Sequence, residues 1–195
     1  GNVMIDTLMA SAREAEGSTI RAEMGLGGEY ALLTLHRPSN VDDARPLQGI
    51  FRGLERLAAR IPVVFPAHPR TARMLAEFGV STGFPGMRLV EPLGYLDFIH
   101  LEKHARLVLT DSGGIQEETT VLGVPCLTLR FNTERPVTIS EGTNVLVGND
   151  PDRIVAEATR VLEGGGKPRT VPELWDGKAA VRIVEVLRRI ACDRV

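Results

Sequence analysis

The chain has 195 residues, of which 43% are hydrophobic, so it can bury one substantial core, and one domain is the default expectation. Its formal net charge of -2 gives no long-range attraction to nucleic acid or to an anionic membrane, which disfavours both as partners. No apolar run reaches the roughly 18 residues of a membrane-spanning helix, and the first residues lack the order of a signal peptide, so we expect a cytoplasmic protein.

Short β-branched runs alternate along the chain with longer segments of helical period, a pattern typical of a parallel sheet covered on both faces. A helix over residues 3–23 and a glycine turn at 25–28 precede the first strand. Strands are predicted at 30–35, 62–66, 87–90, 106–110, 125–129 and 143–147. Helices follow at 43–59, 71–78, 95–103, 115–122, 151–162 and 178–191. Because parallel crossovers are nearly always right-handed, this order predicts one doubly wound, Rossmann-like layer of six strands.

Polar side chains follow four of the predicted strands, at the edge where ligands of doubly wound sheets bind. They are His36, Arg37, His68, Arg70, Ser112 and Arg130. Loop ends are commonly polar, so each residue alone carries little weight, but together they predict a binding rim. His36 and Arg37 supply two cations suited to a diphosphate, and Ser39 or Asn40 is expected to cap the next helix.

Two prolines around His68 fix the backbone of its loop. A rigid loop that presents an imidazole and an ordinary structural turn explain this pattern about equally well.

The stretch 107–118 is the most informative in the chain. An apolar strand runs into Ser112, Gly113 and Gly114 and then into helix-forming residues, which leaves backbone N–H groups uncovered at a helix start. These groups and the helix dipole attract phosphate, and glycine allows close approach. Glu117 and Glu118 would repel a phosphate that they faced, so at least one is expected to take sugar hydroxyls. The stretch therefore predicts a nucleotide ligand.

His100 and His104 stand four residues apart on a predicted helix, a spacing that can place two imidazoles on one face for a metal. The sequence shows no third ligand, and Asp97 and Glu102 read as part of a solvated helix face. The two cysteines form neither a disulfide framework nor a metal set. We therefore predict no metal site.

Seven segments of the chain, in this order, together resemble the UDP-N-acetylglucosamine 2-epimerases. They are Leu35-His36-Arg37, Pro66-Ala67-His68-Pro69, Glu91-Pro92-Leu93, Asp111 to Glu118, Thr133-Glu134-Arg135-Pro136, Glu141-Gly142-Thr143 and Asp176-Gly177-Lys178-Ala179. The resemblance spans nearly the whole chain and is most specific at 111–118 and 134–136. It covers only the C-terminal half of the family, whose members look like two Rossmann-type domains closed over a cleft, as in GT-B glycosyltransferases.

This resemblance implies that UDP binds mainly to this half of the fold. Ser112, Gly113 and Gly114 would hold the diphosphate, and Glu117 the ribose hydroxyls. His36 would contact the phosphate nearest the sugar, and it is the residue of this half expected to act in catalysis.

Further positions take their expected roles from the same resemblance. The backbone around Leu93 to Phe98 would read uracil, and Arg130 would line the same pocket. In bacterial members a second UDP-N-acetylglucosamine can act as an activator, and Arg37 and His68 match positions associated with that allosteric site.

The implied reaction inverts C2 of the sugar to give UDP-N-acetylmannosamine, by elimination of UDP to a glycal and its return. It requires no cofactor and belongs to cell-envelope polysaccharide biosynthesis. Donors aimed at the departing diphosphate would favour the transition state. The carboxylates that move the proton at C2 lie in the family's N-terminal domain, which these residues do not include.

We therefore expect residues 1–195 to be a single UDP-binding domain, obtained as a fragment, a proteolysis product or one piece of a split enzyme. It should bind without turnover, and the resemblance implies a homodimer of the full-length protein. Three alternatives stay open: half of a GT-B glycosyltransferase, a hydrolysing epimerase, and a noncatalytic nucleotide-sugar binding module. The sequence departs from the family at Pro38-Ser39, where many members carry an acidic residue.

Overall fold

The computed structural model describes residues 1–192; residues 193–195 of the predicted domain lie outside the described residues. Six parallel strands form one sheet in the order β3-β2-β1-β4-β5-β6. They are β1 (Ala31–Thr34), β2 (Val63–Pro66), β3 (Met87–Val90), β4 (Leu107–Thr110), β5 (Cys126–Thr128) and β6 (Asn144–Leu146). All six lie at the predicted positions, and their order is the doubly wound one, so the predicted fold class is confirmed.

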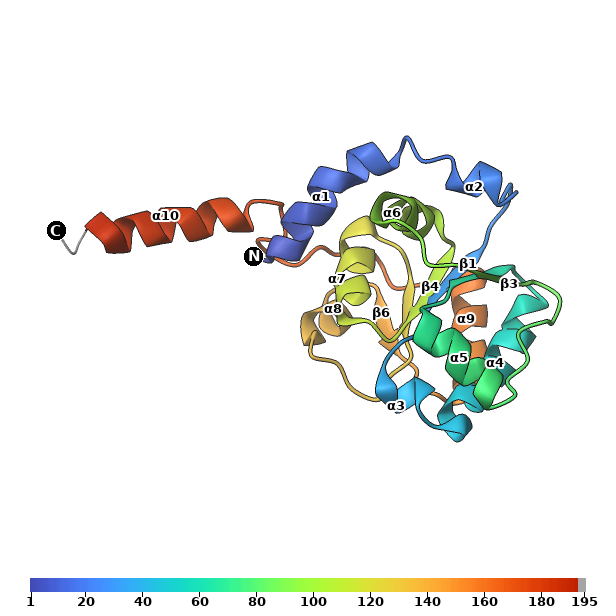
Figure 1. The fold of residues 1–195 in the computed structure, drawn as a ribbon. Helices are drawn as coiled ribbons and strands as arrows, with labels where there is room; N and C mark the ends of the chain where they lie inside the picture. The colour runs from blue at the N-terminus through green and yellow to red at the C-terminus, as the bar shows by residue number, and fades with distance from the viewer. Residues whose placement is uncertain (193–195) are drawn as a thin grey trace.

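The helices of residues 1–192 surround this sheet (Figure 1). They are α1 (Val3–Ala15), α2 (Ile20–Glu23), α3 (Pro38–Val41), α4 (Ala44–Ala58), α5 (Pro69–Glu77), α6 (Tyr95–His104), α7 (Gly113–Leu122), α8 (Pro136–Ser140), α9 (Pro151–Leu162) and α10 (Ala179–Cys192). The single helix predicted over 3–23 is wrong, because the chain leaves the helix between α1 and α2. The short helices α3 and α8 were not predicted; each begins with a proline, whose fixed φ suits a first helical position.

Alternate residues of the central strands β1, β2 and β4 enter two different apolar clusters, as expected for a sheet buried on both faces. On one face, Leu33 and Leu109 pack with residues of α4, α5 and α9. On the other face, Leu32 and Val108 pack with residues of α2 and α6. Helix α1 forms an outer layer over α6 and α7 through Ile5 and neighbouring side chains. Helices therefore cover both faces of the sheet, and a ligand can approach it at the ends of the strands.

The turn after α7 shows why glycine is needed there. Gly123 caps the helix with a left-handed φ of 77°, and its N–H bonds the carbonyl of Thr119. Other residues adopt this conformation at a cost, so glycine ends α7 cleanly before β5 begins.

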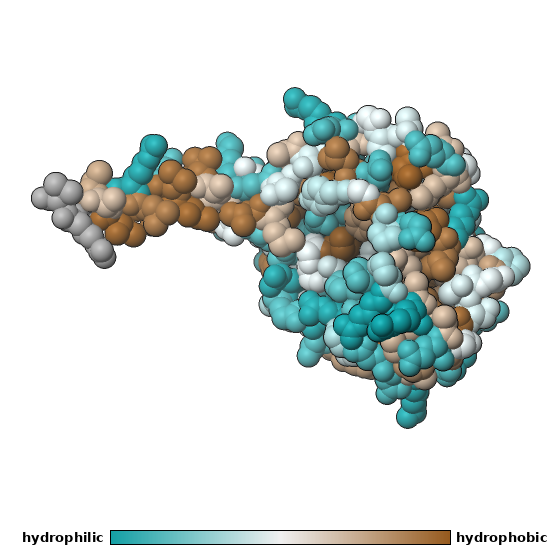
Figure 2. Space-filling model, in the orientation of Figure 1, coloured by the Kyte–Doolittle hydropathy of each residue, from teal (hydrophilic) through white to brown (hydrophobic). Residues whose placement is uncertain are grey.

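Helix α10 leaves the body of the molecule instead of packing on the sheet (Figure 1). Six of its apolar side chains are between 48% and 59% exposed: Val181, Ile183, Val184, Val186, Leu187 and Ile190. The space-filling view shows that much of the surface of this protruding helix is apolar, and we call these six side chains the apolar strip of α10 (Figure 2). None of the helices within residues 1–192 combines the length and apolar composition needed to cross a membrane.

The helix cap expected at Ser39 or Asn40 is also wrong. Asp43 caps α4, and its carboxylate accepts from the N–H of Arg45 at 2.9 Å. Asn40 lies inside α3 instead, and its side-chain amide donates to the carboxylate of Asp111 at 3.2 Å. The sequence signal for a cap is short polar side chains, and it cannot distinguish which of several neighbours faces the helix.

Candidate nucleotide-binding site

The sheet reverses its winding between β1 and β4, because β1 continues toward β2 on one side while β4 continues toward β5 on the other. The hydroxyls of Thr34 and Thr110 lie 2.6 Å apart at the carboxyl ends of these two strands. The loops that follow the two strands therefore lie side by side. A crevice at this point is where doubly wound sheets bind ligands.

Asp111 joins these two loops. Its carboxylate is fully buried and accepts from the backbone N–H of His36 at 3.1 Å and of Arg37 at 2.9 Å, besides the Asn40 amide. The ring Nδ1 of His36 also lies 3.1 Å from this carboxylate. Because Nδ1 faces an acceptor, Nε2 of the half-exposed His36 is left for another partner. Asp111 thus fixes a histidine beside the start of α7.

Helix α7 begins at Gly113, so Gly113 and Gly114 lie in its first turn. Within residues 1–192 the N–H groups of Gly113 and Gly114 have no hydrogen-bond partner, and the Ser112 side chain caps neither. The N–H of Ser112, in contrast, donates to the Thr110 hydroxyl at 3.0 Å. Two of the three expected amides are therefore open, and Ser112 can contribute its hydroxyl instead of its N–H.

Two arginines flank the open amides. A Cβ on Gly113 would lie 3.9 Å from Nη2 of Arg37 and 3.9 Å from Cγ of Arg135. Nε of Arg135 lies 2.6 Å from the carboxylate of the buried Glu117. Arg135 was not predicted as a site residue, although the motif at 134–136 was the available signal. The start of α7 therefore combines unpaired N–H groups with guanidinium charge, a combination suited to phosphate.

Arg130 lies farther along the same rim. Its guanidinium binds both carboxylate oxygens of Glu134 at 2.6 and 2.9 Å, and this bond holds the pKa of Glu134 down at about 2. It lines a cavity of about 340 Å³ together with Asn40 and Asn149. Arg130 is thus positioned by a neighbouring carboxylate and borders a separate hollow of the rim.

His68 borders another hollow. It caps the N-terminus of α5, where its Nδ1 accepts from the N–H of Arg70 at 3.2 Å. Together with His36 and Arg70 it lines a cavity of about 340 Å³ at the ends of β1 and β2. The structure thus brings His68 beside His36, while Arg37 contacts the start of α7.

The segment between β3 and α6 approaches α7 through Tyr95. Leu93 and Phe98 are half-buried and pack on the apolar cluster of the second sheet face. The N–H of Phe98 donates to the carbonyl of Gly94 at 2.9 Å, whereas Leu93 precedes α6, so the backbone ahead of the helix is the part placed to read a base. The Tyr95 hydroxyl donates to Glu118 at 3.2 Å. Burial, followed by the Glu118 charge, raises the pKa of Tyr95 to about 12. Glu118 therefore lies on the α6 side of α7, and Glu117 on the α8 side.

Glu102 was expected on a solvated helix face, and this prediction is wrong. Its side chain is fully buried beside Glu118, and no donor within the described residues bonds either of its oxygens, so its one polar neighbour is the Glu118 carboxyl group. Burial, reinforced by the Glu118 charge, raises the pKa of Glu102 well above its ordinary value. The helical spacing around Glu102 gave no sign that α1 and α7 would cover this side of α6.

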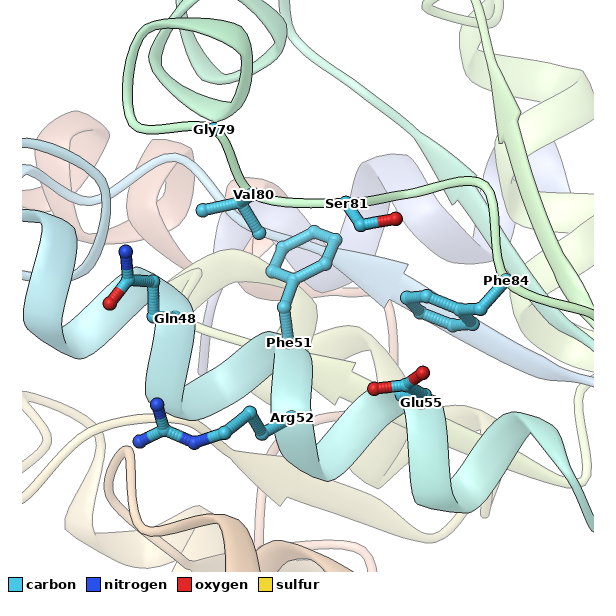
Figure 3. A pocket seen from close by; sticks show the side chains of 8 residues that line it. All are labelled: Gln48, Phe51, Arg52, Glu55, Gly79, Val80, Ser81 and Phe84. Atoms are coloured by element: carbon cyan, nitrogen blue, oxygen red, sulfur yellow. The ribbon is translucent and has the colours of Figure 1, made fainter.

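Another cavity, of about 250 Å³, lies between α4 and the segment 79–84 (Figure 3). The rings of Phe51 and Phe84 extend into it, and Arg52 and Glu55 lie beside it on α4 (Figure 3). It lies away from the open amides and arginines at the start of α7. We therefore place the candidate site at the β1–β4 crevice.

The geometry agrees with comparisons with known proteins. A family model described as UDP-N-acetylglucosamine 2-epimerase matches residues 1–188. The UDP-N-acetylglucosamine 2-epimerase of Methanocaldococcus jannaschii is 38% identical over 196 residues, covering 96% of this chain and 53% of the relative. A crystal structure from the same organism, described as UDP-GlcNAc 2-epimerase in complex with UDP-GlcNAc and UDP, superposes with a TM-score of 0.85 at 38% identity, over 97% of this chain and 54% of that one.

A second relative differs in its sugar. The UDP-2,3-diacetamido-2,3-dideoxy-D-glucuronate 2-epimerase of Pseudomonas aeruginosa is 36% identical over 194 residues, covering 97% of this chain and 52% of the relative. The chain thus spans about half the length of the curated relatives it matches. Two relatives named for different sugars are thus almost equally similar to this chain, at 38% and 36% identity.

Proposed function

Because the chain belongs to the UDP-N-acetylglucosamine 2-epimerase family, we propose that it forms the UDP-binding half of an enzyme that interconverts UDP-N-acetylglucosamine and UDP-N-acetylmannosamine. The observation that carries the proposal is the pair of open N–H groups on Gly113 and Gly114, flanked by Arg37 and Arg135 at the β1–β4 crevice. Such a start of a helix binds a diphosphate through N–H donors and charge together.

The diphosphate is proposed to lie over Gly113 and Gly114, with the Ser112 hydroxyl as a further donor and with Nε2 of His36 as another when the imidazole is protonated. His36 is held in place by Asp111 at 3.1 Å, so it requires little reorganisation to meet an anion. Loss of UDP from the sugar develops negative charge on the phosphate nearest the sugar. Donors already aimed at that charge favour the transition state over the ground state, which makes His36 the catalytic residue of this half.

The uridine is proposed to extend from the diphosphate toward α6, where the backbone of residues 93–98 reads uracil. The ribose must then lie between the start of α7 and Tyr95. The resemblance implied Glu117 as the ribose ligand, but Glu117 is paired with Arg135 on the opposite, α8 side. Glu118, which contacts Tyr95, lies on the uridine side, and we assign the ribose hydroxyls to Glu118.

The two glutamates can be separated by matched alanine variants titrated with UDP in a calorimeter. Glu118→Ala is expected to weaken UDP binding by about tenfold, the equivalent of one charged hydrogen bond, and Glu117→Ala by less. The reverse ranking would return the ribose to Glu117. Equal affinities in both variants and in the parent chain would remove both from the site.

The open amides can be tested with a single added methyl group. In Gly113→Ala the new Cβ is in ordinary contact with Arg37 and Arg135, so the helix can form, but the methyl lies where the phosphate must approach. UDP binding is expected to fall by at least about tenfold. Gly28→Ala, whose Cβ meets nothing within 4 Å, is the matched control and should keep the affinity of the parent chain. A Gly113→Ala variant that binds UDP normally contradicts the proposal.

Proton removal and return at C2 of the sugar require groups beyond this chain, which covers only about half of its relatives. The reaction is therefore proposed for the whole protein, and the isolated chain should bind UDP without turnover. Product analysis on the whole protein separates the alternatives. Epimerisation yields the two UDP-sugars alone, hydrolysis releases UDP with free N-acetylmannosamine, and glycosyl transfer consumes an acceptor. A binding module forms no product.

Helix α10 supplies a contact for the rest of such a protein. Its exposed apolar strip is the kind of surface that is covered by a partner, and the relatives contain a half that this chain does not span. We assign the strip to that other half. A homodimer of the whole protein also belongs to this proposal, and light scattering on the whole protein tests it. Association of this chain with itself through α10 would contradict the assignment.

The cavity lined by His36, His68 and Arg70 is proposed to take the second, activating UDP-N-acetylglucosamine. Arg37, the other residue that the resemblance implied for that site, lies beside Gly113 instead. His68→Ala should then abolish activation of the whole enzyme by excess substrate without weakening UDP binding to this chain. Loss of UDP affinity in His68→Ala would instead assign His68 to the substrate itself.

A further inference from the structure

Three side chains that can bind a metal lie together at the outer layer of α1 and α6, apart from the nucleotide site. His100 and His104 lie on successive turns of α6, with their ring centroids 4.6 Å apart. Glu16 ends α1, the helix that packs across α6. One ligand atom from each of the three residues lies within 4.8 Å of the others. The sequence showed the histidine pair, but the third ligand comes from a distant part of the chain.

His100 is oriented as metal-binding histidines are. The residue is only 8% exposed, and its Nδ1 lies 2.8 Å from the backbone carbonyl of Ala15. A carbonyl oxygen only accepts, so Nδ1 carries the hydrogen and Nε2 keeps its lone pair. A carbonyl that fixes the tautomer and the ring in this way is the usual outer partner of a metal-bound imidazole.

His104 and Glu16 complete the cluster from its solvent side. Nε2 of His104 lies 3.5 Å from Oε2 of Glu16, and the two side chains are 31% and 45% exposed. Burial and the neighbouring His100 lower the pKa of His104, so its imidazole is neutral at neutral pH. The bond from Lys103 lowers the pKa of Glu16, which keeps it a carboxylate. These two ligands therefore lie where an ion from solvent can reach them.

Two cations oppose a metal here. Lys103 contacts Oε1 of Glu16, and the charge of Arg21 acts on His104. The Lys103 contact occupies the oxygen of Glu16 that is turned away from His104, so Oε2 remains available to the cluster. The cations therefore reduce the affinity for a divalent ion without blocking the ligand atoms.

We propose that Glu16, His100 and His104 form a binding site for a divalent transition metal of the zinc type. Two imidazoles with one carboxylate are a ligand set that zinc uses, whereas magnesium and calcium prefer sites built of oxygen ligands. The fourth position opens to solvent. Because the ligands come from two helices, a bound ion ties α1 to α6 and stabilises the folded chain.

The test uses the purified chain after treatment with a chelator. Calorimetric titration with zinc is expected to show one equivalent bound, and cobalt should give the visible absorption of a tetrahedral nitrogen and oxygen site. His104→Ala and Glu16→Gln are each expected to weaken zinc binding by at least about tenfold. Both side chains are partly exposed, so these variants avoid the folding defect that substitution of the buried His100 would risk.

His68→Ala is the matched control, since it removes an exposed histidine outside the cluster, and zinc affinity should not change. Lys103→Met removes the opposing cation and is expected to strengthen zinc binding by about tenfold. A chain that binds no zinc, or a His104→Ala variant that binds it as His68→Ala does, overturns the proposal. UDP titration of His104→Ala and Glu16→Gln should give the affinity of the parent chain. The metal proposal can therefore fail without any change in UDP binding.

Discussion

Asp111 and Glu102 are both fully buried carboxyl groups, but their surroundings are opposite. Asp111, in the crevice between β1 and β4, accepts from the N–H groups of His36 and Arg37 and from the Asn40 amide. Glu102, between α6 and α7, meets no donor within residues 1–192 and lies beside the Glu118 carboxyl group, and burial raises its pKa well above its ordinary value. Burial therefore does not decide what a carboxyl group does. The donors around Asp111 make it the organiser of the site, whereas Glu102 is kept as a neutral acid.

Removal of the Asp111 carboxylate should have the largest effect. Asp111→Ala leaves its buried donors without an acceptor, so we expect the free energy of unfolding to fall by about 3 kcal/mol or more, together with loss of UDP binding. Urea denaturation and calorimetry measure the two effects. Asp42→Ala, which breaks an exposed ion pair with Arg70, is the control and should cost less than about 1 kcal/mol. Equal losses in the free energy of unfolding for Asp111→Ala and Asp42→Ala would show that the buried carboxylate stabilises the fold no more than the exposed one.

Removal of the Glu102 carboxyl group should raise the free energy of unfolding, the opposite of the effect expected at Asp111. Because its pKa is raised in the folded chain, folding holds a proton that the unfolded chain releases above the ordinary value of 4.5. The contribution of Glu102 to the free energy of unfolding is therefore present at acid pH and is lost as the pH rises. Glu102→Met is expected to raise the free energy of unfolding by about 2 kcal/mol near pH 8 and by less near pH 5.

The comparison for Glu102→Met is Glu77→Met, which replaces an exposed glutamate of α5. Its stability should follow the parent chain at both pH values. Urea denaturation at the two pH values measures each variant. A Glu102→Met variant that is less stable than the parent chain near pH 8 would contradict the claim that folding holds Glu102 as a neutral acid.

Glu117 is intermediate between Asp111 and Glu102, because it is a buried carboxylate whose partner is a single arginine. Arg135→Ala removes that partner. The variant removes the cation that lies 2.6 Å from Glu117 and so creates a second buried carboxylate without a partner. We expect a loss of about 1 kcal/mol in the free energy of unfolding and UDP binding weaker by about tenfold. Arg56→Ala, from an exposed pair with Asp152, should change neither quantity. An unchanged UDP affinity in Arg135→Ala would exclude Arg135 from the groups that hold the diphosphate.

The smallest effect is expected at the exposed strip of α10. Leu187 is 59% exposed, so Leu187→Ser should change the free energy of unfolding of this chain by no more than about 0.5 kcal/mol. Leu101→Ser, in the buried part of α6, is the matched control and should cost several times more. In the whole protein, the α10 variant should weaken the contact with the other half. A large loss of stability in the isolated chain would show that α10 packs on this domain.

The local features of the fold were predictable because they arise within short stretches. Apolar runs of strand length, separated by segments of helical period, predicted all six strands. They also predicted that the polar residues after these strands would gather at one end of the sheet. The helices α3 and α8 were missed because four or five residues are too few to show a period. The break between α1 and α2 was missed although Gly17, Ser18 and Thr19, which favour a turn, lie within it.

The chemistry at the start of α7 was also predictable from the chain alone, since a strand followed by Ser112, Gly113 and Gly114 leaves N–H groups open wherever it occurs. What tertiary structure decided was which charged groups meet. Arg135 reaches Glu117, Glu118 reaches Tyr95, and Glu16 joins a histidine pair, each from another element. Backbone periodicity reports which side of a helix is apolar, but not which distant residue will lie against it. The charge state and partner of every buried acid therefore depend on the packing of whole elements.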